Sequence, residues 1–459
     1  MTVTTERREL VDRIWQRDPT VWTGGDEAKW LGWLDEPLRM HERVPELELF
    51  ADQVVDEGFE AVVLLGMGGS SLAPEVLRRS FGVVESLHVL DTTHPKAIRT
   101  LESSIELGQT LFVVSSKSGS TLETRSHADY FWERAGKRGR QFVAVTDPGS
   151  ELERVAQDRG FRAVFPGEPT IGGRYSALSP FGMVPAALMG VDLDRLLANA
   201  ERMVEACRRD DGNPGFELGR QFGHGWQDGR DKICIPETDG GFGLWAEQLI
   251  AESTGKQGRG LVPAPGESPD GPDRQETTVH LADPYMLGSE FFRWMFAVAV
   301  AGHYLEINPF DQPDVQAAKD KTNEVLATGQ EPSLDPEGSV DELLSRAEPG
   351  NYVCVQAFVE PNEENDWRIG NLVTKLRRRS GLVVTHGYGP RYLHSTGQLH
   401  KGGPNTGLFL QVVDDTGEEL PIPNRPFGFG RLIRAQAAGD YASLKERGRR
   451  VARVRLEDL

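Results

Sequence analysis

Short apolar runs alternate with amphipathic stretches along most of this chain. Helical spacing of apolar residues, without a strand-like run, dominates residues 1 to about 55. Beyond them, candidate buried strands lie at residues 61–65, 87–90, 110–114, 141–145, 232–236, 276–281, 352–359, 382–385 and 408–413. Helical patterns separate these runs, and such alternation is typical of parallel sheets covered by helices on both faces. The pattern therefore predicts an α/β fold built from doubly wound parallel sheets.

A chain of 459 residues is too long for one ordinary core, so several domains are expected. Polar, Pro-containing stretches near residues 208–215 and 330–348 mark the candidate boundaries, and the Pro-rich residues 263–272 are interpreted as an irregular surface loop. The predicted units are a helical entry segment at 1–46, α/β domains at 47–190 and 215–345, and a C-terminal α/β segment at 346–459.

Composition narrows the classes of partner. The 70 acidic and 51 basic residues give a formal charge of −19, which disfavours nucleic acid and anionic membranes as partners. Cys207, Cys234 and Cys354 lie far apart, without the spacing of a disulfide framework or a zinc site. The first residues lack the apolar core of a signal peptide, and no apolar run is long enough for a membrane span. We therefore expect a soluble, cytoplasmic protein.

Two turns after candidate strands have the chemistry of an anion site. The stretch GMGGSS follows residues 61–65, and its glycines permit a tight turn before a helix. The stretch SSKSGSTLET follows residues 110–114, and it combines hydroxyls, a glycine and Lys117 ahead of another helix. Backbone N–H groups and the helix dipole would add to such a site, and a phosphate is its natural ligand. Taken alone, a capped Ser/Thr-rich loop explains this stretch equally well.

Other candidate residues are individually ambiguous. Gln248 and Glu252 share one face of a predicted helix, where a carboxylate could act as a general base or simply face solvent. Arg174 follows two glycines and could present a fixed cation or lie on the surface. His394 and His400 lie in a polar glycine-rich loop without the spacing of a metal site.

Five stretches in order resemble the phosphoglucose isomerases, which are built on two sugar-isomerase (SIS) domains. They are GMGGSSLAP, SSKSGSTLET, GGRYSALSPFG, AESTGK and NPFDQPDVQAAK, and they span about residues 47 to 325. Five ordered motifs are far more specific than any one of them. The C-terminal segment, with STGQLHKGG, resembles the isomerase part of bacterial transaldolase and phosphoglucose isomerase fusion proteins.

The resemblance implies a homodimeric enzyme that interconverts glucose 6-phosphate and fructose 6-phosphate through a cis-enediol, without metal or organic cofactor. Glu252 would be the base, and Gln248 would contact the sugar. Arg174 would stabilise the enediolate, and Lys319 would assist ring opening. The residues implied in phosphate binding are Gly69, Ser70, Ser116, Lys117, Ser118, Ser120 and Thr121. Dual phosphoglucose/phosphomannose isomerase activity and a non-catalytic SIS sugar-phosphate sensor are the alternative functions.

The sequence departs from the family pattern at two places. No histidine between Glu252 and Lys319 has the family's ring-opening motif, since His280 and His303 lie in other contexts. We therefore expect the C-terminal segment to supply this histidine, with His400 favoured over His394, from the same subunit or across a dimer interface. Asp314 and Gln316 also replace the family's Gly and Glu shortly before the lysine, so the geometry of that turn stays open.

Overall fold

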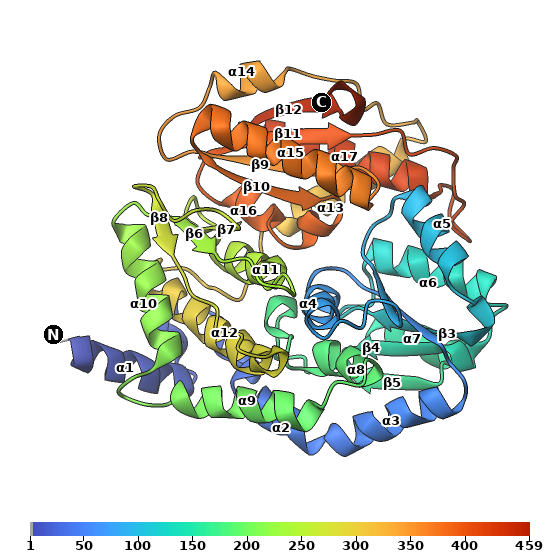
Figure 1. Ribbon diagram of the computed structural model, residues 1–459, viewed down its shortest axis with the longest axis horizontal. Helices are drawn as coiled ribbons and strands as arrows, with labels where there is room; N and C mark the ends of the chain where they lie inside the picture. Colours follow the sequence, from blue (N-terminus) through green and yellow to red (C-terminus); the bar gives the residue numbers. More distant parts are fainter. Residues whose placement is uncertain (1–2) are drawn as a thin grey trace.

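The computed structural model describes residues 3–459, and side chains are described for residues 8–314 and 319–459. Three sheets organise the chain, and within the described residues every pairing between their strands is parallel (Figure 1). Parallel strands need crossover connections, and helices supply them here. The predicted fold class, α/β with parallel sheets, is confirmed.

The first sheet has the strand order β2-β1-β3-β4-β5. Its strands are β1 (Ala61–Leu65), β2 (Leu87–Leu90), β3 (Thr110–Ser115), β4 (Phe142–Thr146) and β5 (Ala163–Pro166). Alternate residues pack on opposite faces: Val62 and Leu64 join one hydrophobic cluster, and Val63 and Leu65 join another. Because both faces are covered, the strands are mostly apolar, which is why the sequence pattern found most of them.

Helices on both faces of this sheet complete the first unit. They are α3 (Val44–Asp56), α4 (Leu72–Ser80), α5 (Pro95–Ser104), α6 (Leu122–Arg134), α7 (Glu151–Asp158) and α8 (Pro180–Leu188). Helices α4 and α6 begin directly after the turns that follow β1 and β3. The two candidate anion-binding turns therefore lie at the carboxyl ends of adjacent strands, where open α/β sheets bind ligands.

The second unit contains a short sheet with the order β7-β6-β8. Its elements are β6 (Lys232–Ile235), β7 (Val262–Pro265), β8 (Arg274–Glu276), α10 (Pro214–Gln227), α11 (Gly243–Thr254) and α12 (Leu287–Tyr304). Two predictions are wrong here. Residues 262–265, interpreted as part of a surface loop, form an edge strand that tolerates two prolines. The strand expected at 276–281 is instead β8, which ends at Glu276.

The third unit has the order β10-β9-β11-β12. Its elements are β9 (Tyr352–Phe358), β10 (Val383–Tyr388), β11 (Gly407–Val413), β12 (Arg450–Arg455), α14 (Val340–Leu344), α15 (Glu363–Ser380), α16 (Gly397–Gly402) and α17 (Phe429–Glu446). In Figure 1 this unit, coloured orange to red, lies across both other units. A bidentate ion pair between Arg391 and Asp91, at 2.7 and 2.9 Å, joins it to the first unit. The Glu267 carboxylate accepts from Arg377 at 2.8 Å and joins it to the second.

The remaining helices brace the units from outside the sheets. They are α1 (Val3–Trp15), α2 (Glu36–Glu42), α9 (Leu193–Ala206) and α13 (Val315–Ala327). The first three belong to the predicted helical entry or to the connection between the first two units, and α13 packs extensively on α17. Across the part of the chain that the structure describes, no helix has the length and apolar character needed to cross a membrane.

Candidate active site

The turn after β1 is a place of close backbone approach. A Cβ added to Gly69 would lie 2.0 Å from the Gly173 carbonyl oxygen, so the turn meets the segment that carries Arg174. Gly68 has a φ of +56°, and a Cβ there would lie 2.7 Å from the His394 carbonyl oxygen. Only glycine fits both positions. This turn therefore brings segments of the first and third units together.

The turn after β3 presents hydroxyls at the N-terminus of α6. The Ser116 hydroxyl accepts from the Gly119 N–H at 3.2 Å and lies 3.2 Å from the Thr121 hydroxyl. Ser118 and Ser120 hydroxyls lie 2.9 Å apart. Thr121 occupies the N-cap position without a side-chain cap hydrogen bond, so its hydroxyl does not satisfy the first N–H groups of α6.

Lys117, predicted as a phosphate ligand, faces other groups. Its Nζ forms an ion pair with Asp147 and donates to the Glu168 and Pro169 carbonyl oxygens, both at 3.3 Å. Its charge is thereby neutralised within the first unit.

Helix α11 carries the predicted base. Gln248 and Glu252 lie one turn apart, and the Gln248 Nε2 donates to the Glu252 carboxylate at 3.0 Å. The same amide group donates to the His394 carbonyl oxygen at 2.8 Å. The other oxygen of Glu252 lies 3.3 Å from the Arg174 guanidinium. These contacts fix the carboxylate from two sides.

Arg174 is almost completely buried, and its donors are occupied. Nε donates to the Ser253 hydroxyl at 2.9 Å, and Nη1 donates to the Gln312 side chain at 2.9 Å. Nη2 donates to the carbonyl oxygens of Pro309 and Asp311, at 2.9 and 2.8 Å. Arg174 therefore ties the base helix to the segment 308–314.

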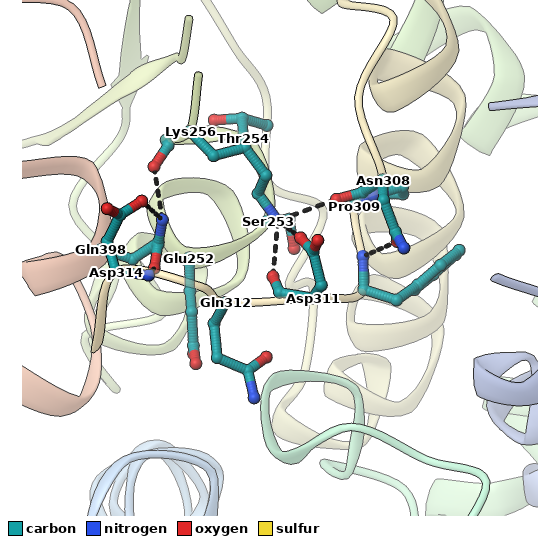
Figure 2. Close-up of polar contacts among 12 residues, drawn as sticks. Glu252, Ser253, Thr254, Lys256, Asn308, Pro309, Asp311, Gln312, Asp314 and Gln398 are labelled. Carbon is teal, nitrogen blue, oxygen red and sulfur yellow. Dashed lines mark hydrogen bonds and ion pairs between the residues drawn. The ribbon is translucent and has the colours of Figure 1, made fainter. Parts of the chain in front are cut away.

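Lys256, two residues after the C-terminus of α11, also holds this segment, as Figure 2 shows. Its buried Nζ donates to the Asn308 carbonyl oxygen at 2.8 Å and forms an ion pair with Asp311 at 2.6 Å. Burial, with the nearby charge of Arg174, lowers the pKa of Lys256 to about 8. In Figure 2 the side chains of Glu252 and Gln312 point the same way, away from this cluster.

Asp314, at the end of this segment, contacts residues of the third unit. Its carboxylate accepts from the Gln398 amide at 2.8 Å and pairs with Arg447 at 2.8 Å, and its N–H donates back to Gln398 at 2.9 Å. The departure from the family pattern at this position thus has a structural role toward the third unit. The side chain of Gln316 lies outside the described residues. Helix α13 follows at once and carries Lys319.

His394 comes from the third unit and contacts a carboxylate that the sequence reasoning missed. Its Nε2 lies 2.9 Å from the buried carboxylate of Glu123, which also accepts from Gln436 at 2.7 Å. Burial alone would raise the pKa of Glu123, but the charge and hydrogen bond of His394 lower it to about 2. Glu123 lies within SSKSGSTLET, two residues after Thr121. The sequence signal for it was an acidic residue in the first turn of a predicted helix, where the helix dipole favours a negative charge.

His400 lies elsewhere, on the short helix α16. Its ring is buried, with Nε2 3.6 Å from the Cys354 sulfur and Nδ1 3.4 Å from the Gln356 amide, and it packs on Tyr392 and Phe409. Burial and the charge of the neighbouring Lys401 hold the pKa of His400 well below its ordinary value. The structure therefore places His400 in the interior of the third unit rather than beside Glu252.

Two adjoining cavities collect the candidate residues. The base cavity, about 210 Å³, is lined by Met67, Gly68, Gly69, Gln248, Glu252, Gln312, Lys319 and His394. The hydroxyl cavity, about 350 Å³, is lined by Ser120, Thr121, Leu122, Glu123, Lys319, Thr322, Asn323, Leu393, His394, Arg425 and Gln436. Lys319 and His394 line both, so the cavities meet at these two side chains.

Several predicted residues stay outside these cavities. Among the described side chains, His394 is the only histidine that lines either one. The Nδ1–H of His303 donates to the Val21 carbonyl oxygen at 2.6 Å, and His280 is exposed. The predicted residues that line neither cavity are Ser70, Ser116, Lys117, Ser118, Arg174 and His400. Gln312 and Arg425 line a cavity but were not predicted.

The parallel α/β architecture is similar to that of a solved glucose-6-phosphate isomerase. Residues 53–209, about a third of the chain, match the family model "Phosphoglucose isomerase". A glucose-6-phosphate isomerase from Thermosynechococcus vestitus is 33% identical over 267 residues, which cover 50% of each chain. One from Citrifermentans bemidjiense is 40% identical over 215 residues, covering 43% of this chain and 40% of that protein. The resemblance inferred from the five motifs is confirmed.

Solved structures support the fold over a longer part of the chain. A glucose-6-phosphate isomerase from Chlamydia trachomatis gives a TM-score of 0.58 at 18% identity, covering 80% of this chain and 88% of that one. A hypothetical protein from Thermus thermophilus gives 0.50 at 21% identity, covering 98% and 84%. At these identities the likeness concerns the fold. The chain spans about half the length of the curated relatives named above.

Proposed function

We propose that this chain is a glucose-6-phosphate isomerase, which interconverts glucose 6-phosphate and fructose 6-phosphate. The observation that carries the proposal is the base cavity, where Glu252, Gln248, Lys319 and His394 converge from α11, α13 and the third unit. A carboxylate, an ammonium and an imidazole around one small cavity are the groups that ring opening and proton transfer between neighbouring carbons require.

Ring opening is assigned to His394 and Lys319. Both line the base cavity and the hydroxyl cavity, so both can reach a sugar that extends from one into the other. The Glu123 carboxylate, 2.9 Å from the His394 ring, orients the imidazole. The histidine of the proposed site therefore belongs to the same chain as Glu252.

Isomerisation itself is assigned to Glu252. The base removes the proton at C2 of the open-chain aldose and returns it to C1 through the cis-enediol, while the sugar keeps its position. The amide side chains of Gln248 and Gln312 line the cavity and supply hydrogen-bond groups to the sugar oxygens. Arg174 acts through these residues, since its donors hold Glu252, Ser253 and Gln312 in place.

The test is turnover of fructose 6-phosphate by the purified chain in a coupled assay with a chelator present. We expect wild-type turnover, and a fall of about 10² to 10⁴-fold for Glu252→Gln, which keeps the shape but not the base. Glu247→Gln is the matched control, because Glu247 lies on the same helix and lines neither cavity. Full turnover in Glu252→Gln, or none in the wild type, would contradict the proposal. Mannose 6-phosphate, assayed in parallel, separates glucose 6-phosphate isomerase from a dual phosphoglucose/phosphomannose isomerase.

A further inference from the structure

The hydroxyl cavity has the features of an anion site. The hydroxyls of Ser120 and Thr121 line it, and they belong to the N-terminus of the 13-residue helix α6. Uncapped N–H groups and the positive end of the helix dipole favour an anion at such a place. In the proposed reaction the only strongly anionic part of the substrate is its phosphate group. Each cavity also contains one carboxylate, Glu252 in the base cavity and Glu123 in the hydroxyl cavity, and the carboxylate of Glu123 is held by His394 at 2.9 Å and by Gln436 at 2.7 Å.

A doubly charged phosphate in this cavity requires cationic side chains. Lys117 does not provide one, because its Nζ is paired with Asp147 and it lines neither cavity. Lys319 lines both cavities and is assigned to the sugar ring. His394 is held against the Glu123 carboxylate at 2.9 Å. The remaining cation on the wall of the hydroxyl cavity, among the described side chains, is Arg425.

Arg425 lies in the segment 414–428, which connects β11 to α17 in the third unit. This segment is held by a bridge between Pro421 and Gly428. The side chains of Leu420 and Ile422 are buried in the hydrophobic cluster that covers one face of the first sheet. The segment therefore packs against the first unit and presents Arg425 beside the hydroxyls of α6.

The guanidinium of Arg425 has capacity for a ligand. Its Nε is buried and has no hydrogen-bond acceptor among the described residues, and its only ring contact is with Phe427, at 5.9 Å. No carboxylate of the described residues pairs with it within 4.0 Å, unlike the guanidinium of Arg434 nearby, which pairs with Glu331 at 2.8 Å. A half-buried guanidinium without an anionic partner, on the wall of a cavity, is matched to a bidentate phosphate contact.

We propose that Arg425 of the third unit binds the phosphate group of the sugar phosphate, together with Ser120 and Thr121 of the first unit. This inference rests on the proposed function. In the proposed arrangement, the phosphate lies in the hydroxyl cavity, and C1 and C2 of the sugar lie beside Glu252 in the base cavity. This arrangement also gives the third unit a second role, since the same unit then supplies both His394 and the phosphate-binding arginine.

The experiment measures binding without turnover. Calorimetric titrations with fructose 6-phosphate and with inorganic phosphate are made in a Glu252→Gln background. We expect Arg425→Gln to weaken both by about 10 to 100-fold, as the loss of a charged hydrogen-bond pair implies. Arg425→Lys should recover part of the affinity, because an ammonium keeps the positive charge but lacks the planar guanidinium that can donate two parallel hydrogen bonds. Arg431→Gln is the control, since Arg431 donates to the Leu326 carbonyl oxygen and lines neither cavity.

In the background with Glu252 restored, Arg425→Gln should raise KM for fructose 6-phosphate and change kcat by less than about threefold. Unchanged affinity for phosphate in Arg425→Gln would overturn the inference. If Arg425→Gln fails to fold, the same decision rests on Arg425→Lys, whose phosphate affinity must fall measurably. A wild-type chain that binds phosphate through Arg425 but isomerises no sugar would refute the proposed function and leave this inference standing.

Discussion

The contact between Glu123 and His394 links the first and third units, and its strength can be measured. Glu123→Gln removes the charge of a buried carboxylate and keeps its shape, so the variant resembles the protonated form of Glu123. Folding lowers the pKa of this carboxyl from an ordinary value of 4.5 to about 2, chiefly through His394 acting against the effect of burial. At about 1.4 kcal/mol per pKa unit, ionised Glu123 stabilises the fold by about 3 kcal/mol at neutral pH.

The pH dependence follows from the direction of this change. Since the folded chain holds the proton less tightly than the unfolded chain, acid favours unfolding as the pH falls from 4.5 toward 2. Glu123→Gln should therefore cost about 3 kcal/mol at pH 7 and at pH 5, but only about 1.5 kcal/mol at pH 3. Urea unfolding of both proteins at these three pH values measures the difference in the free energy of unfolding.

Glu133→Gln provides the matched control on the same helix. Glu133 is exposed and pairs with Lys137 at 3.0 Å on the surface, so its replacement should change the free energy of unfolding by less than about 1 kcal/mol. The reasoning is refuted if Glu123→Gln costs as much at pH 3 as at pH 7, or no more than the control at pH 7. Either result would mean that His394 does not hold Glu123 in its ionised form.

Three further substitutions test the groups around Glu252 and the choice between the two histidines. Lys256→Met should lower the free energy of unfolding by about 1 to 3 kcal/mol, measured in urea, because it leaves the Asn308 carbonyl without its buried donor and removes the ion pair with the partly exposed Asp311. His394→Ala should reduce turnover of cyclic glucose 6-phosphate by at least about 10²-fold, whereas His400→Gln, which keeps a polar side chain in the buried site, should leave turnover within about threefold. The opposite order of these two effects would return the ring-opening role to His400.

Local patterns in the sequence were sufficient for most of the strands. The runs at 61–65 and 87–90 match β1 and β2 at both ends, because strands of a covered parallel sheet are mostly apolar and are followed here by polar or glycine-containing segments. Strand β7 escaped this reasoning. Its prolines at positions 263 and 265 are typical of a loop, and only the edge position beside β6 makes them compatible with a strand.

The site could be predicted only where neighbouring residues define it. Glu252, Gln248 and Lys319 belong to ordered motifs and line the base cavity. The choice between His394 and His400 depends on which of the two rings is buried in the third unit. The six-residue spacing between them does not show which ring that is. Gln312 and Arg425 reach their positions through contacts between sequence-distant units, which no local pattern records.

Dependence on all three units also explains why the candidate site is coupled to the whole fold. The carbonyl oxygen of His394 accepts from Gln248 of the second unit, and its ring contacts Glu123 of the first. Neither contact exists unless the third unit is docked on both, and the ion pair between Arg391 and Asp91 fastens that docking nearby. Because the proposed ring-opening histidine and the proposed phosphate-binding arginine arrive together on this unit, docking assembles both ends of the substrate site at once. A change that loosens the third unit should therefore weaken phosphate binding and ring opening together, while the base on α11 keeps its own contacts with Arg174.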